Sequence, residues 1–98
     1  MPFEIRYSPR ANSEYEEIID YIFQKFGRVV ALKVYLHFED IIDQISINPL
    51  LFPYSNNAKN LRRCVVSPQT TVYYRFNGRY VELVSFRGNR MNPETISL

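Results

Sequence analysis

The sequence predicts an α+β domain in which a helical hairpin packs on one face of a mainly antiparallel four-stranded sheet, in the order β-α-α-β-β-β. Two observations lead to this prediction. Two long segments repeat apolar residues at helical spacing, and shorter segments before and after them alternate apolar and polar residues. Because 98 residues leave room for one hydrophobic core, residues 1–98 are predicted to form a single domain.

The first strand is expected over residues 3–7, where the run FEIRY alternates apolar and polar side chains. Ser8 then offers an N-cap, and Pro9 occupies the first position of a helix. Apolar residues recur at helical spacing as far as Phe26, and Gly27 ends the helix. The opposite side of this helix is acidic and holds Glu14, Glu16, Glu17 and Asp20.

The second helix is expected to start near Arg28 and to stop at Asn48-Pro49. Its apolar stripe is wider than one face, because Val29, Leu32 and Leu36 extend it. A helix of this kind is buried from two directions or covers a partner. We expect the first arrangement, with burial against both the first helix and the sheet.

Three strands are predicted after an irregular segment over residues 49–59. They cover residues 61–66, 71–76 and 80–86, and a polar tail follows from residue 87. Asn77-Gly78 separates the last two strands and predicts a hairpin in which both central positions have positive φ.

Charge is divided unevenly between the two halves of the chain. Residues 1–48 hold five Lys and Arg against eight Asp and Glu, and residues 49–98 hold seven against two. The halves therefore carry −3 and +5, which together give the net charge of +2. This asymmetry points to an anionic partner for the basic half.

Several classes of site and location are excluded by composition. The single Cys64 and the single His37 give no metal cluster and no catalytic triad, so no metal or cofactor is expected. Cys64 is expected in the core, and His37 on the solvated side of the second helix. No apolar run approaches the ~20 residues that span a bilayer, and no signal peptide is apparent. A cytoplasmic protein is expected.

Arginines and tyrosines alternate along the predicted closing strands. Because neighbouring residues of a strand point to opposite faces, Tyr73 and Arg75 lie on the open face of the sheet if Tyr74 faces the helices. Arginine with aromatic rings on an open face suits a nucleic-acid backbone or an acidic protein segment. The alternative is a solvated face with local ion pairs.

Five stretches, taken in order, resemble one known family. They are SPRANSEYEEIIDYI, FEDIIDQISINPLLFP, LRRCVV, TVYYRF and YVELVSFRGNRMNPE. Their order, spacing and total length resemble the RelE/ParE superfamily of small bacterial toxins from type II toxin–antitoxin modules, often labelled plasmid stabilisation proteins. The resemblance covers nearly the whole chain and implies the fold given above.

The resemblance also separates two mechanisms. Ribosome-dependent mRNA interferases of the superfamily use Lys and Arg with a tyrosine near the C-terminus, or a Glu and a His. One such pattern puts two lysines where this chain has Arg62 and Cys64, and an arginine near Thr71. Arg90, or its neighbour Asn89, stands at the position of an arginine after the last strand, but no tyrosine or histidine follows it. Arginine alone is a poor general base at neutral pH, which favours the ParE-like branch, whose members are implicated in poisoning DNA gyrase.

The resemblance therefore implies a growth-inhibiting toxin that binds an essential, gyrase-like target and is neutralised by a cognate antitoxin. Two alternatives stay open. One is a ribosome-dependent mRNA interferase (an endoribonuclease) with a rearranged cluster of Arg62, Arg75, Arg87 and Arg90. The other is a non-toxic remnant that binds nucleic acid or an antitoxin. The residues expected to contact the target or antitoxin are Arg62, Arg63, Tyr73, Arg75, Arg87 and Arg90.

Overall fold

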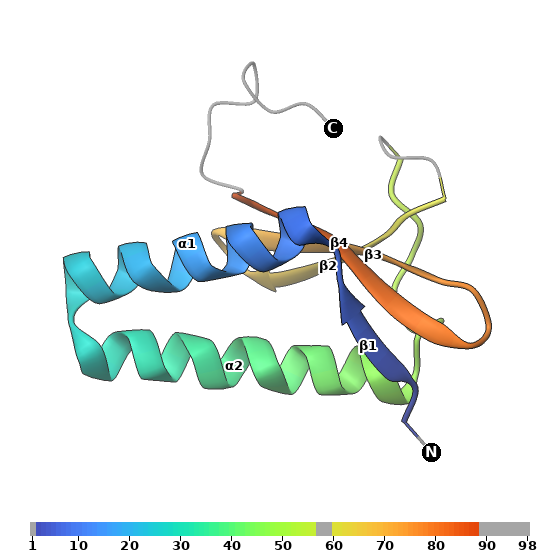
Figure 1. Ribbon diagram of the computed structural model, residues 1–98, viewed down its shortest axis with the longest axis horizontal. Helices are drawn as coiled ribbons and strands as arrows, with labels where there is room; N and C mark the ends of the chain where they lie inside the picture. Colours follow the sequence, from blue (N-terminus) through green and yellow to red (C-terminus); the bar gives the residue numbers. More distant parts are fainter. Residues whose placement is uncertain (1, 57–59, 89–98) are drawn as a thin grey trace.

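Two helices and a four-stranded sheet form two layers, as Figure 1 shows. The computed structural model describes residues 2–56 and 60–88. Its elements are β1 (Glu4–Tyr7), α1 (Pro9–Phe26), α2 (Arg28–Ile47), β2 (Arg62–Ser67), β3 (Thr70–Phe76) and β4 (Tyr80–Gly88). The predicted α+β class and order of elements are confirmed, and the strands and helices begin and end close to their predicted positions.

The strand order across the sheet is β1-β4-β3-β2. β1 runs parallel to β4, whereas the β4–β3 and β3–β2 pairs are antiparallel, as a mainly antiparallel sheet requires. β1 pairs only with residues 80–83 of β4. The rest of that edge of β4 needs other hydrogen-bond partners.

The start of α1 supplies these partners. The Ser8 backbone N–H donates to the carbonyl of Leu83 (2.9 Å), and the Ser8 hydroxyl donates to the carbonyl of Val84 (2.8 Å). One oxygen of the Glu14 carboxylate accepts the Phe86 N–H (3.0 Å) and the Ser85 hydroxyl (2.8 Å). Glu14 is therefore not a solvated acid, and it attaches α1 to the edge of β4.

Local sequence also sets the ends of the helices. The Ser8 hydroxyl accepts the Ala11 N–H at 2.9 Å, so the predicted N-cap is confirmed, with Pro9 following it. Gly27 links α1 to α2 with a φ of +92°, a value that glycine adopts without steric cost. A one-residue link of this kind folds the helices back on each other as a hairpin.

The core lies between the hairpin and the sheet. Its largest fully buried side chains include Tyr74, Phe38 and Ile45. The Tyr74 hydroxyl donates to the carbonyl of Pro49 (2.7 Å), which satisfies a polar group that burial would otherwise leave unpaired. Cys64 is only 1% exposed, as expected, and burial raises the pKa of its thiol to about 11.

The hairpin projects beyond the sheet, and its turn lies at the left of Figure 1. α2 packs against both α1 and the sheet, as expected, but this overhang leaves the widened part of its apolar stripe uncovered. Val29, Leu32 and Leu36 are 67%, 55% and 56% exposed. α1 and the sheet cover one side of α2, and the described residues leave these three side chains facing solvent. Neither helix in the described part of the chain is long and apolar enough to cross a membrane.

The β3–β4 turn differs in detail from its prediction. Gly78 has a φ of +91°, but Asn77 does not have positive φ. The Asn77 side-chain oxygen instead accepts the N–H groups of Arg79 (2.9 Å) and Tyr80 (3.0 Å). Because its side chain caps the turn, Asn77 precedes the bend, and glycine alone takes the left-handed position.

Candidate partner-binding groove

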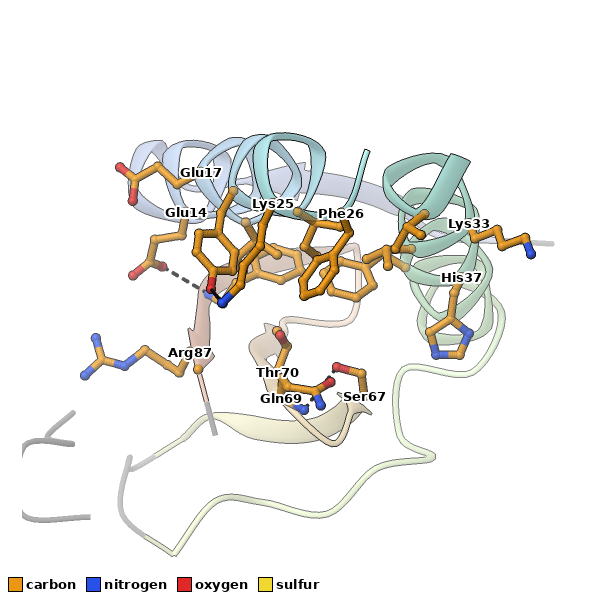
Figure 2. A pocket seen from close by; sticks show the side chains of 18 residues that line it. Glu14, Glu17, Lys25, Phe26, Lys33, His37, Ser67, Gln69, Thr70 and Arg87 are labelled. Atoms are coloured by element: carbon orange, nitrogen blue, oxygen red, sulfur yellow. Dashed lines mark hydrogen bonds between the residues drawn. The ribbon is translucent and has the colours of Figure 1, made fainter. Parts of the chain in front are cut away.

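A groove of about 1040 Å³ lies beneath the projecting hairpin. The helices form its roof and the β2–β3 turn forms its floor, as Figure 2 shows. Its apolar lining includes Ile18, Tyr21, Ile22, Phe26, Val30 and Val34. Tyr21 and Phe26 are 53% and 54% exposed. Aromatic side chains at this exposure are typical of a surface that receives a partner.

Cationic side chains surround much of this apolar surface. Lys25, Lys33 and Arg87 line the groove together with His37, against the two carboxylates Glu14 and Glu17. Glu14 is already engaged at the edge of β4. The groove therefore combines apolar anchor positions with an excess of positive charge, which suits an acidic amphipathic segment.

His37 connects α2 to the sheet at the mouth of this groove. Its Nε2 lies 2.6 Å from the carbonyl oxygen of Val66 in β2. Because a carbonyl only accepts, Nε2 must hold a proton and donate. The ring is exposed, as predicted from its position, but it is also held by this hydrogen bond to β2.

Arg62 lies on the side of the sheet that the helices cover, because it alternates with the buried Cys64 along β2. Its Nη1 donates to the carbonyl of Phe52 (2.7 Å), and its guanidinium carbon lies 4.1 Å from the centroid of the Tyr54 ring. These contacts fix the loop after α2 against the start of β2. At least one of the five N–H donors of Arg62 is therefore used inside the protein.

Arg63, Tyr73 and Arg75 lie on the open face of the sheet. Arg63 pairs across the strands with Tyr73, and Arg75 pairs with Glu82. The Arg75 Nε donates to the Glu82 carboxylate at 2.7 Å in an ion pair. On the same face the guanidinium of Arg6 lies 3.8 Å from the centroid of the Tyr80 ring.

Arg87 lies apart from these residues, in the lining of the groove. It faces Thr71 at the end of the β3–β4 ladder opposite to Arg75. Arg90 lies outside the described residues. The structure thus distributes Arg62, Arg75 and Arg87 over the covered side of the sheet, its open face and the groove, and does not bring them together.

The apolar side chains of the hairpin are functional candidates that the sequence did not single out. The signal was present in the apolar stripe of α2, which is too wide for one buried face. Its interpretation depended on how far the hairpin extends past the sheet, and spacing along a helix does not report this.

The side chains that line the groove include apolar, cationic and acidic groups. In residues 2–56 and 60–88, no three His, Cys, Asp or Glu side chains gather in a way that could hold a metal ion. Burial raises the pKa of Cys64, which keeps this thiol protonated and unreactive at neutral pH. What the groove offers a partner is apolar surface and positive charge.

Comparison with known families gives a decisive match. The family model described as ParE toxin of type II toxin-antitoxin system, parDE, matches residues 5–93. The chain belongs to the ParE toxin family. No curated protein sequence matches it significantly.

Solved structures show the same fold at low sequence identity. A chain of "Chromosomal ParDE TA system from P. aeruginosa" is 13% identical, with a TM-score of 0.75 over 88% of this chain and 95% of that one. "YoeB/ParE toxin from Agrobacterium tumefaciens" is 13% identical, with a TM-score of 0.64 over 89% and 99%. A chain of the E. coli DinJ-YafQ complex is 12% identical, with a TM-score of 0.59 over 90% and 93%.

Proposed function

We propose that this ParE-family protein is a cytoplasmic toxin that arrests bacterial growth by binding an essential target, with DNA gyrase as the first candidate, and that a cognate antitoxin neutralises it. The observation that carries the proposal is the open apolar groove with its cationic lining, in a chain of the ParE family. Such a site provides affinity for a protein segment and needs no reaction.

The antitoxin is proposed to occupy the groove. Two of the structural relatives are described as a ParDE system and a DinJ-YafQ complex, which supports a partner protein of this kind. The bound segment would place apolar side chains against Tyr21 and Phe26 and acidic side chains near Lys25, Lys33 and Arg87. Close charge pairs at an interface contribute affinity when desolvated, and pairs at its rim mainly raise the association rate.

The hydrogen bonds and ion pairs that the arginines make within the protein favour a binding function over RNA cleavage. The Arg75 guanidinium is paired with Glu82, and Arg62 donates to the Phe52 carbonyl. The Glu82 carboxylate is held in that ion pair on the open face, and the Phe52 carbonyl beside Arg62 is a backbone acceptor, so both guanidinium groups already have partners within the protein. Arg63 and Tyr73 remain proposed contacts for the target on the open face, and Arg87 for the antitoxin.

Expression in a bacterial host tests the toxin role. Induction of this protein alone is expected to stop growth, and co-expression of the protein encoded by the adjacent gene is expected to restore it. Normal growth at high soluble expression would contradict the proposal and favour a non-toxic remnant. Primer extension on translated transcripts tests the alternative, because reproducible cuts in the ribosomal A site would establish an mRNA interferase.

Calorimetry with the adjacent gene's product tests the location of the antitoxin. Lys33→Glu should weaken binding roughly tenfold, since it places an acid in the lining of the groove. Arg28→Glu is the matched control, because Arg28 is exposed at the start of the same helix and does not line the groove. Equal losses for both variants would show that net charge, rather than the groove, determines binding.

A further inference from the structure

A second cleft, of about 850 Å³, lies on a different face of the hairpin from the groove. The cleft is lined by residues 12, 16, 19, 20 and 23 of α1, whereas the groove is lined by residues 14, 18, 21, 22 and 25 of the same helix. Helical periodicity places these two sets on separate faces of α1. Glu17 alone lines both cavities.

Aromatic rings from both helices form the apolar part of this cleft. Tyr15 is 8% exposed, and its ring centroid lies 6.2 Å from that of Tyr35. Its hydroxyl donates to the Glu39 carboxylate (2.7 Å), which holds the ring in place. Phe23 and Tyr35 are 47% and 42% exposed. Ring surface is therefore presented to solvent by a fixed framework.

The charge of this cleft is opposite to that of the groove. Glu16, Glu17 and Asp20 are three of the nine residues that line it, and none of the nine is cationic. No ion pair joins these carboxylates to another residue within the described ranges. Glu16 and Asp20 are also four residues apart on α1, a spacing at which like charges destabilise a helix. A cation bound between them would relieve this repulsion.

Exposed rings beside unpaired carboxylates match the chemistry of arginine and lysine side chains. The apolar stem packs on a ring face, the charged group gains a cation–π contact, and the carboxylates supply ion pairs. An acidic segment would be repelled. The groove and the cleft are therefore complementary to partners of opposite charge.

We propose that this cleft binds a cationic, arginine- or lysine-bearing segment of the target protein, while the groove binds the acidic antitoxin. This inference rests on the proposed function for the identity of the partner. The binding chemistry of the cleft itself rests on the rings and carboxylates described above.

Two designed peptides test that chemistry on the isolated protein. They share leucines at helical spacing and differ only in their flanking residues, which are glutamates in one and arginines in the other. In NMR titrations the arginine peptide should shift the signals of Asp20, Phe23 and Tyr35, and Asp20→Lys should weaken its binding about tenfold. The net charge of +2 opposes this binding, so general attraction does not explain it.

Asp43→Lys is the matched control, because Asp43 is exposed on α2 and lines neither cavity. The glutamate peptide should bind wild type and Asp20→Lys equally, which shows that the variant is folded. The inference is overturned if the arginine peptide leaves the cleft signals unshifted, or if Asp43→Lys weakens its binding as much as Asp20→Lys does.

A growth assay then tests the role of the cleft. At equal expression, the number of colonies that survive induction should be at least about tenfold higher for Asp20→Lys and Phe23→Ala than for wild type. Asp43→Lys should leave as few survivors as wild type. Full toxicity of both cleft variants would refute binding of the target there and leave the toxin proposal intact. If wild type does not inhibit growth, the proposed function fails, and the peptide titration alone decides whether the cleft binds cations.

Discussion

Among the acidic residues of α1, Glu14 should be the one whose replacement by alanine destabilises the protein most. One carboxylate oxygen accepts the Ser85 hydroxyl at 2.8 Å and the Phe86 N–H at 3.0 Å. Ser85 and Phe86 are 2% and 3% exposed, so water does not replace the lost acceptor readily. Glu14→Ala therefore leaves two buried donors unsatisfied at the edge of β4.

The magnitude follows from these two bonds. A hydrogen bond to a charged group contributes about 1.5–3 kcal/mol, so the loss should be about 3 kcal/mol or more. The ion pair of Glu14 with Arg10, at 3.3 Å, adds little because the Arg10 side chain is 56% exposed. In a domain of this size, a loss of 3 kcal/mol lowers Tm by roughly 12–24 °C.

Urea unfolding followed by circular dichroism measures this loss. Glu17→Ala is the matched control, because Glu17 is exposed one turn later on α1, and its change should stay within about 0.5 kcal/mol. Glu14→Gln keeps one carbonyl oxygen as an acceptor and should lose less than Glu14→Ala does. A Glu14→Ala variant within 1 kcal/mol of wild type, on the order of ordinary surface changes, would refute the view that this carboxylate holds α1 to β4.

Two further predictions concern the core. Tyr74→Phe should cost about 1–2 kcal/mol in urea unfolding, because the Pro49 carbonyl loses its donor, and an unchanged midpoint would contradict this role. The Cys64 thiol has a pKa of about 11 against an ordinary 9.0, so it favours the folded state fully below pH 9, and this contribution is lost as pH rises from 9 through 11. The stability of Cys64→Ala should therefore fall less steeply than that of wild type between these pH values, and parallel slopes in urea titrations would contradict the burial of a protonated thiol.

The helices and strands could be predicted because their boundary signals are local. Ser8-Pro9 starts α1 and Gly27 ends it, and each signal acts within a few residues of its own position. The class of the fold followed from the order of these elements. The β3–β4 turn was predicted less accurately. The Asn77 side chain accepts a backbone hydrogen bond there, and only Gly78 of the pair has positive φ.

The groove and the cleft could not be predicted, because both depend on the relative length of the hairpin and the sheet. Pattern alone placed Glu14 with Glu16 on an acidic face, yet only Glu14 meets the edge of β4. Strand alternation also predicted that Arg62 and Cys64 share a face of the sheet. It did not predict that the Arg62 guanidinium donates a hydrogen bond to the Phe52 carbonyl. That carbonyl belongs to an irregular loop, whose path has no periodic signal.

The proposed function requires that this ParE-family protein act by binding a target rather than by cutting RNA. The most direct measurement is the covalent gyrase–DNA complex, quantified during induced expression alongside growth. We expect gyrase-trapped DNA breaks to increase as growth stops. When the adjacent gene is co-expressed, the breaks should fall to the uninduced level and the growth rate should recover. Growth arrest with cuts in the ribosomal A site and no trapped breaks would contradict it.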